Sequence, residues 1–330
     1  MTALFLARFV LTYMTLALLI VLAQYIETYI HSLVHGTCHS FSKSFKDLIR
    51  PGLKTIANFS EQGSLERVKI ILFLLITFLL LLIPFSFFPL AEPLISENGK
   101  LYLEIIGESN GMYILGASIL LYTFLKLILQ YSDAHFELID INQSAANNFL
   151  SGIFFIVSFY LLGINKESRS LHSVMNDQMG SLFEIFPAWN LYKAPISALL
   201  FILSLILSVP SSQSVDIKAQ YKSSKIYWVF RDHQGIFSKI ILLTFSIYFA
   251  VVYMGGYNIP GILAPIINHF PSSYTIVQIF SMIFKIVFVQ ILIFWIKAIF
   301  PATSKTSLQF NLWIYGGFLI AAGFIKMRLM

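Results

Sequence analysis

The chain contains very little cysteine and very little charge. Its single cysteine, Cys38, excludes an internal disulfide and any iron–sulfur or zinc cluster built from several cysteines of this chain alone. Only 12% of the 330 residues are charged, about half the share that is usual in a soluble domain. The sequence also lacks a phosphate-binding P-loop and the GxGxxG, HExxH and GxSxG motifs. We therefore expect no nucleotide site and no catalytic residues within this chain alone.

Apolar residues dominate the chain instead. They make up 57% of it, including 32 Phe and 16 Tyr, and the mean hydropathy is +0.78. A membrane-spanning helix needs about 20 predominantly apolar residues. The sequence predicts an all-α integral membrane protein with one polytopic domain, 1–330, and about eight transmembrane helices, at 4–23, 70–88, 112–129, 145–164, 194–209, 240–254, 274–296 and 310–325.

The positive charges of the chain indicate its orientation. The net charge of +6 comes from Lys and Arg that lie in loops between apolar runs, so we interpret it as a topology signal and expect no nucleic-acid partner. With eight spans, 13 Lys and Arg residues fall on one side and six on the other. This bias places both termini outside and the first loop inside. The first apolar run is too long for a signal peptide and is interpreted as an uncleaved helix.

The first inside loop has the pattern of an amphipathic helix. Its apolar residues share one helical face and its polar residues the other: Phe45, Leu48, Ile49, Leu53, Ile56 and Phe59 against Lys46, Asp47, Arg50, Lys54 and Asn58. Such a helix lies at the membrane interface. Pro51 is expected to kink it. Anchoring to the membrane surface would by itself explain this pattern.

One charged residue falls in the middle of a predicted span. Lys285 lies halfway along 274–296, and intramembrane charge is costly and usually placed for function. Two interpretations remain open. Lys285 is either part of a proton relay or ion site, or a structural lysine bonded to backbone carbonyls between helices.

Four potential metal ligands cluster after the first span. They are His31, His35, Cys38 and His39, and the spacing of the two first histidines can place both imidazoles on one metal. No carboxylate completes the set at a recognised spacing. We interpret the cluster as a polar segment at the membrane interface and predict no metal there, with a metal site as the less favoured alternative.

Several short stretches become informative through their order and spacing. They are I-E-T at 26–28, L-I-R-P-G-L-K at 48–54, F-P-A-W at 186–189, Y-M-G-G-Y-N-I-P at 253–260 and W-I-K-A-I-F-P at 295–301, with Lys285 ten residues before Trp295 and Trp313 twelve residues after Pro301. Together with the predicted topology they resemble a membrane subunit of respiratory complex I, namely mitochondrial NADH dehydrogenase subunit 1 and its counterpart in bacterial NADH-quinone oxidoreductase. Related membrane-bound hydrogenases use the same subunit. The resemblance covers the chain from about Glu27 to the last helix.

The resemblance implies a subunit of an NADH:quinone oxidoreductase that anchors the soluble electron-transfer arm and forms part of the quinone pocket. The implied partners are other membrane subunits, iron–sulfur subunits, quinone and lipid. No cofactor is expected on this chain alone, because quinone is a substrate of the whole complex. The host membrane would be the bacterial cytoplasmic membrane or the mitochondrial inner membrane. The residues that the resemblance places near quinone are Glu27, Arg50, Pro51, Phe59, Asp216 and Lys297. For Glu27 the implied role is to shape the pocket entrance or to pin the amphipathic helix through a basic partner.

The chain departs from the family in the charges that line the quinone chamber and the path from it. The family's loop between helices five and six reads roughly R-x-P-F-D-x-x-E-x-E-x-E-L, and this chain retains only Asp216 there. The family's arginine and glutamate of helix four fall on Gln143 and Gly152. Carboxylates in a low-dielectric channel carry protons because their pKa values lie near the working pH. We therefore expect proton transfer through this subunit to be weakened or absent.

Two acidic residues before the fourth predicted helix could replace the missing ones. Glu137 and Asp140 would share a helical face if that helix begins early, with Lys285 as their charge partner. The favoured interpretation is that both are solvated loop charges. Three functions therefore remain: a quinone oxidoreductase subunit, a divergent scaffold subunit without a proton-coupling role, and an independent membrane transporter.

Overall fold

The computed structural model describes residues 2–36, 40–59, 64–82, 85–86, 88, 94–96, 99–101, 117, 120–121, 138–162, 171–179, 181–182, 186–208, 225–259, 274–299 and 305–329. Nearly all of these residues are helical. The helices are α1 (Thr2–His35), α2 (Phe41–Phe59), α3 (Ser64–Leu82), α5 (Leu138–Leu162), α6 (Leu171–Asn176), α7 (Asn190–Lys193), α8 (Pro195–Ser208), α9 (Lys225–Tyr253), α11 (Tyr274–Ile299) and α12 (Lys305–Leu329). Two short antiparallel hairpins join them, one of β1 (Leu94–Ser96) with β2 (Gly99–Leu101) and one of β3 (Ser181–Leu182) with β4 (Phe186–Pro187).

The molecule is an all-α membrane protein. Among the residues described, three helical segments are long and apolar enough to cross a membrane, namely Leu6–Val34, Ile236–Tyr253 and Tyr274–Ile296. Three shorter apolar segments accompany them, Phe149–Leu162, Pro195–Leu207 and Asn311–Lys326. The predicted third span, 112–129, lies almost wholly outside the described residues. Large apolar side chains such as Phe284 and Phe318, each 71% exposed, cover the outer surface, as expected of a surface that faces lipid.

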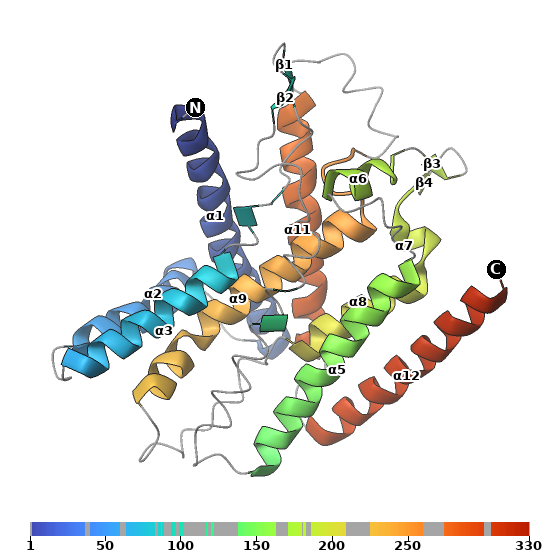
Figure 1. The fold of residues 1–330 in the computed structure, drawn as a ribbon. Coiled ribbons are helices and arrows are strands. Elements are labelled where there is room, and N and C mark those ends of the chain that lie inside the picture. Colours follow the sequence, from blue (N-terminus) through green and yellow to red (C-terminus); the bar gives the residue numbers. More distant parts are fainter. Residues whose placement is uncertain are drawn as a thin grey trace.

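Helix α9 forms the centre of the molecule. Its residues are buried on all sides from 240 onward, and α1, α3, α8 and α11 pack around it (Figure 1). The sequence placed the start of this span at residue 240, whereas the helix begins fifteen residues earlier, at Lys225. Lys239 was therefore counted as a loop charge although it lies inside the helix and is only 5% exposed. The cation interrupts the apolar run, and that interruption was taken for a helix boundary.

Hydroxyl groups join α5 to α8. Ser151 and Ser204 donate to each other's backbone carbonyl at 2.8 Å, and Ser197 donates to the carbonyl of Ser158 at 2.5 Å. The two pairs are seven residues apart on each helix, which is two turns, so the same faces meet twice in antiparallel register. The Tyr253 hydroxyl lies 2.7 Å from Ser197 Oγ and connects this pair to α9.

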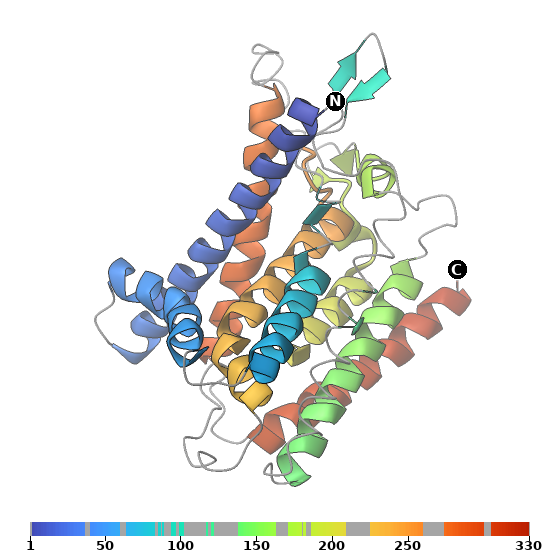
Figure 2. The same ribbon diagram turned by 60° about the vertical axis from the view of Figure 1, so that its left-hand side comes forward.

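Helix α12 packs along α5 through glycine. A Cβ at Gly316 would overlap the ring of Phe154, and a Cβ at Gly323 would overlap the side chain of Leu161. Both glycines and both larger residues are seven positions apart in the same sense, so the two helices run parallel, as Figure 2 shows. Small residues allow such close approach between helices in a membrane.

Candidate functional site

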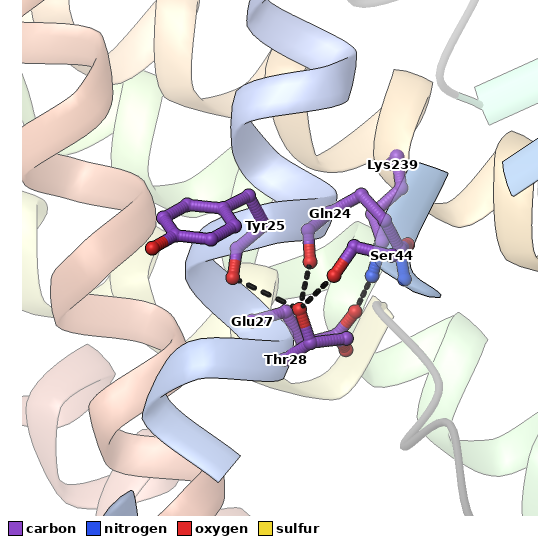
Figure 3. Close-up of polar contacts among 6 residues, drawn as sticks. All are labelled: Gln24, Tyr25, Glu27, Thr28, Ser44 and Lys239. Carbon is purple, nitrogen blue, oxygen red and sulfur yellow. Dashed lines mark hydrogen bonds and ion pairs between the residues drawn. The ribbon is translucent and has the colours of Figure 1, made fainter. Parts of the chain in front are cut away.

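An ion pair joins α1 to α9 near the end of α1. Glu27 accepts from the ammonium of Lys239, and their side chains are 23% and 6% exposed (Figure 3). The same ammonium lies 5.3 Å from the centre of the Phe294 ring on α11. Lys239 is thus held by contacts to two neighbouring helices. A buried cation without such a partner would be strongly unfavourable, so the pair fixes the position of α1 against α9.

A hydroxyl pair beside this ion pair joins α1 to α2. Thr28 Oγ1 lies 2.8 Å from Ser44 Oγ and within 2.9 Å of the carbonyls of Gln24 and Tyr25 (Figure 3). Ser44 is 2% exposed, so this contact is buried although α2 is largely exposed. The start of α2 is therefore attached to the same turn of α1 that carries Glu27.

Helix α2 presents an apolar face that is largely exposed. Phe41, Phe45, Ile49 and Leu53 recur at helical spacing and are 41–61% exposed. The helix is continuous from Phe41 to Phe59, so Pro51 does not break it. A face of this kind next to a membrane-spanning bundle has the character of an interfacial helix.

A second polar cluster surrounds the C-terminal end of α9. Helix termini leave carbonyl groups without intrahelical partners, and side chains satisfy them here. Gln178 donates to the carbonyl of Val251 at 2.9 Å, and Asn190 donates to that of Val252 at 2.8 Å. The Gln178 carbonyl oxygen accepts in turn from the backbone amides of Asn190 and Gly255.

The chain turns at Gly255 and Gly256, beyond the end of α9. Their φ angles are +68° and +54°, a region in which residues with a Cβ are strained. The Gly256 amide donates back to the carbonyl of Ala250 at 2.7 Å. The turn exposes the next carbonyls toward α11, and Asn258 anchors it by donating to the carbonyl of Met175 at 2.6 Å.

Lys285 fills the space that this turn creates. Its ammonium donates to the carbonyls of Gly256 and Asn258, both at 2.6 Å, and lies 5.0 Å from the centre of the Trp189 ring. The residue is 3% exposed. A cation in this position also interacts favourably with the negative end of the α9 dipole. The arrangement corresponds to the structural interpretation of Lys285, since carbonyls and an aromatic face satisfy the charge.

The other sequence-predicted residues are only partly placed. Arg50 lies exposed on α2. Pro51, Phe59 and Lys297 lie in α2 and α11, and Asp140 lies in the first turn of α5, but their side chains are not among those described. Glu137 and Asp216 lie outside the described residues, as do Cys38 and His39. Helix α5 begins at Leu138, seven residues before the predicted start, so it includes Asp140 and starts directly after Glu137.

Sequence reasoning missed several residues of these clusters. Lys239, Ser44, Gln178 and Asn190 were not singled out as site residues. Lys239 could have been found, because it directly precedes the predicted span 240–254 and an extension of that helix by one turn would have included it. Gln178 gave no such signal, since it lies in a short connecting segment whose packing against α9 depends on tertiary structure.

No protein-family model matches the chain, and no curated protein matches it either.

Proposed function

We propose that this chain is a membrane subunit of a complex I-like NADH:quinone oxidoreductase, which anchors the soluble electron-transfer arm and forms part of the quinone pocket. The protein would cross the membrane about eight times, in the bacterial cytoplasmic membrane or the mitochondrial inner membrane. Quinone would carry the redox chemistry, and this chain would contribute binding and orientation.

The observation that carries the proposal is the convergence of separate sequence stretches that resemble the family. Trp189 of F-P-A-W, Gly256 and Asn258 of Y-M-G-G-Y-N-I-P, and Lys285 all contact one another through the Lys285 ammonium. These stretches lie up to about 100 residues apart in the sequence. If the likeness to the family were due to chance, there would be no reason for these separate stretches to contact one another at the Lys285 ammonium.

A second convergence involves the first loop. Glu27 and Thr28 of I-E-T lie on the turn of α1 that contacts the start of α2, and α2 carries the L-I-R-P-G-L-K stretch. The exposed apolar face of α2 suits an interfacial position beside a pocket that a lipid-soluble quinone would enter. The candidates Glu27 and Arg50 would then lie near its entrance.

The helix directions support an even number of spans. Helix α5 runs antiparallel to α8 and parallel to α12. In Figures 1 and 2 the N-terminal end of α1 and the C-terminal end of α12 are both upper ends. Both termini on one side is the arrangement that the positive-charge bias predicts.

Purification under gentle conditions tests the proposal. The full chain, tagged at one terminus, would be extracted in mild detergent and the co-migrating chains identified by mass spectrometry. We expect partners with iron–sulfur and flavin-binding motifs and quinone reductase activity in the isolated assembly. A homo-oligomer or a lone chain would refute the proposal and favour an independent transporter.

The scaffold function is supported by one specific observation. Lys285 is held by two carbonyls and an aromatic ring, which is the environment of a structural lysine. Its test is the double substitution Glu137→Gln and Asp140→Asn in the whole complex, reconstituted in vesicles. We expect little proton pumping through this subunit before the substitution and no loss of electron transfer after it. A fall in protons pumped per electron, with electron transfer intact, would reveal a rerouted path and contradict the scaffold function.

A further inference from the structure

Gln290 on α11 is a fully buried side chain with an unsatisfied carboxamide. Its exposure is 0%, and within the part of the chain that the structure describes neither its Nε2 nor its Oε1 has a hydrogen-bond partner. The contrast with Gln178 is informative, because that buried glutamine uses both ends of its carboxamide. Buried polar groups are paired in the great majority of proteins, so an unpaired carboxamide in a membrane-spanning helix requires a ligand or a reason.

The surroundings of Gln290 are apolar close by and charged further away. Ile286, Ile293 and Phe294 lie on the same side of α11 and are buried. Lys285 is five residues away toward one end of the helix, about 7.5 Å along its axis. Phe294, whose ring is beside the Lys239 ammonium, is four residues away toward the other end, about 6 Å along the axis. Gln290 therefore lies between the two lysine clusters.

We propose that the Gln290 carboxamide holds a buried water molecule where α11 packs against α1 and α9. Water both donates and accepts, as a carboxamide does, so one molecule can satisfy either end of the side chain and a second can satisfy the other. A neutral carboxamide between two buried lysines gives no basis for holding a cation.

The site gives the core of the bundle a polar position that neither lysine cluster includes. Its buried neighbours on the same side of α11 are Ile286, Ile293 and Phe294, and beside such apolar residues water is retained only if a protein group binds it. This inference does not depend on the proposed quinone function, because it follows from the burial and pairing of one side chain.

Hydroxyl-radical footprinting of the full chain in lipid nanodiscs tests the site. X-rays generate radicals from water, and radicals from a held water modify buried side chains beside it. We expect oxidation of Phe294 and Ile293 in the wild-type chain, reduced at least fivefold in Gln290→Met. The matched control is Gln278→Met, at another buried glutamine of α11, which should leave that oxidation unchanged. Phe201, fully buried in the aromatic cluster of α8, serves as the internal standard and should remain unmodified.

Two results would overturn the proposal. One is background oxidation at Phe294 and Ile293 in the wild-type chain, and the other is equal oxidation in the wild type and in Gln290→Met. If Gln290→Met fails to fold, the wild-type chain can be mixed with ¹⁸O-labelled water shortly before irradiation. A held water would give product that retains ¹⁶O at short delays, whereas immediate ¹⁸O incorporation would show access of bulk water and refute a bound molecule.

Discussion

Replacing Lys285 by methionine should destabilise the protein strongly. Methionine keeps most of the buried apolar volume but removes two hydrogen bonds from a charged donor and one contact to the Trp189 ring. Such hydrogen bonds contribute about 1.5–3 kcal/mol each, and a buried cation–π contact about 2 kcal/mol. Hydrogen bonds between membrane helices measured by double-mutant cycles contribute less, about 0.6 kcal/mol on average, because the unfolded chain in the membrane also finds partners.

Between these limits we expect a loss of about 3 kcal/mol, or roughly a hundredfold change in the unfolding equilibrium. The carbonyls of Gly256 and Asn258 would remain buried without a donor, and this cost has no compensation. Reversible unfolding of the full chain in mixed detergent micelles would measure the difference. The matched control is Lys193→Met, at an exposed lysine of α7, for which we expect a change below about 0.5 kcal/mol. Equal stability of the two variants would refute the structural role of Lys285.

Three further predictions concern other parts of the molecule. Glu27→Gln should destabilise the chain by about 3 kcal/mol and lower the quinone reductase activity of the intact complex, because the buried ammonium of Lys239 loses its partner. Adding Lys239→Met should recover part of the stability, since the unpaired charge is then removed. Losses of stability that simply add in thermal unfolding of the double variant would contradict this pairing. In a chain without the native cysteine, Lys46→Cys and Lys193→Cys should react with an impermeant reagent from opposite sides of the membrane, and labelling of both from one side would contradict the eight-span topology. Gly256→Ala should lower stability by about 1–3 kcal/mol because its φ is +54° and a Cβ would overlap a methionine side chain, whereas alanine at an exposed glycine of α12 should have little effect on the melting temperature.

The fold class was predictable because apolar runs of helical length are visible in any single sequence. The predicted segments for α1, α5, α8, α11 and α12 overlap the helices that form, although most helices extend further at one or both ends. Helix ends depend on contacts that a hydropathy pattern does not contain. Thus Lys239 lies inside α9, where it pairs with Glu27 on another helix, and the sequence alone gives no sign of that partner.

The candidate site was predictable only in part. Lys285 was singled out because charge inside a membrane span is rare and costly, and Glu27 was singled out through the family resemblance of the I-E-T stretch. Their partners could not be derived, since Glu27 pairs with a residue about 210 positions away and Lys285 is bound by backbone carbonyls. Every residue has a backbone carbonyl, so the sequence does not show which carbonyls bind Lys285. Only the two glycines at 255 and 256 indicated the turn that presents these carbonyls.

The glycine contacts between α12 and α5 have a consequence for how the protein is made. Phe154 and Leu161 on α5 fit against glycines that are synthesised about 160 residues later. Because the chain is synthesised at about 5–20 residues per second, that face of α5 exists for about 8–30 seconds before α12 is complete enough to cover it. In water an open row of Phe and Leu would invite aggregation during this time, but lipid tails solvate it about as well as another helix does. The last helix can therefore be added late, into a groove that the bilayer has kept open.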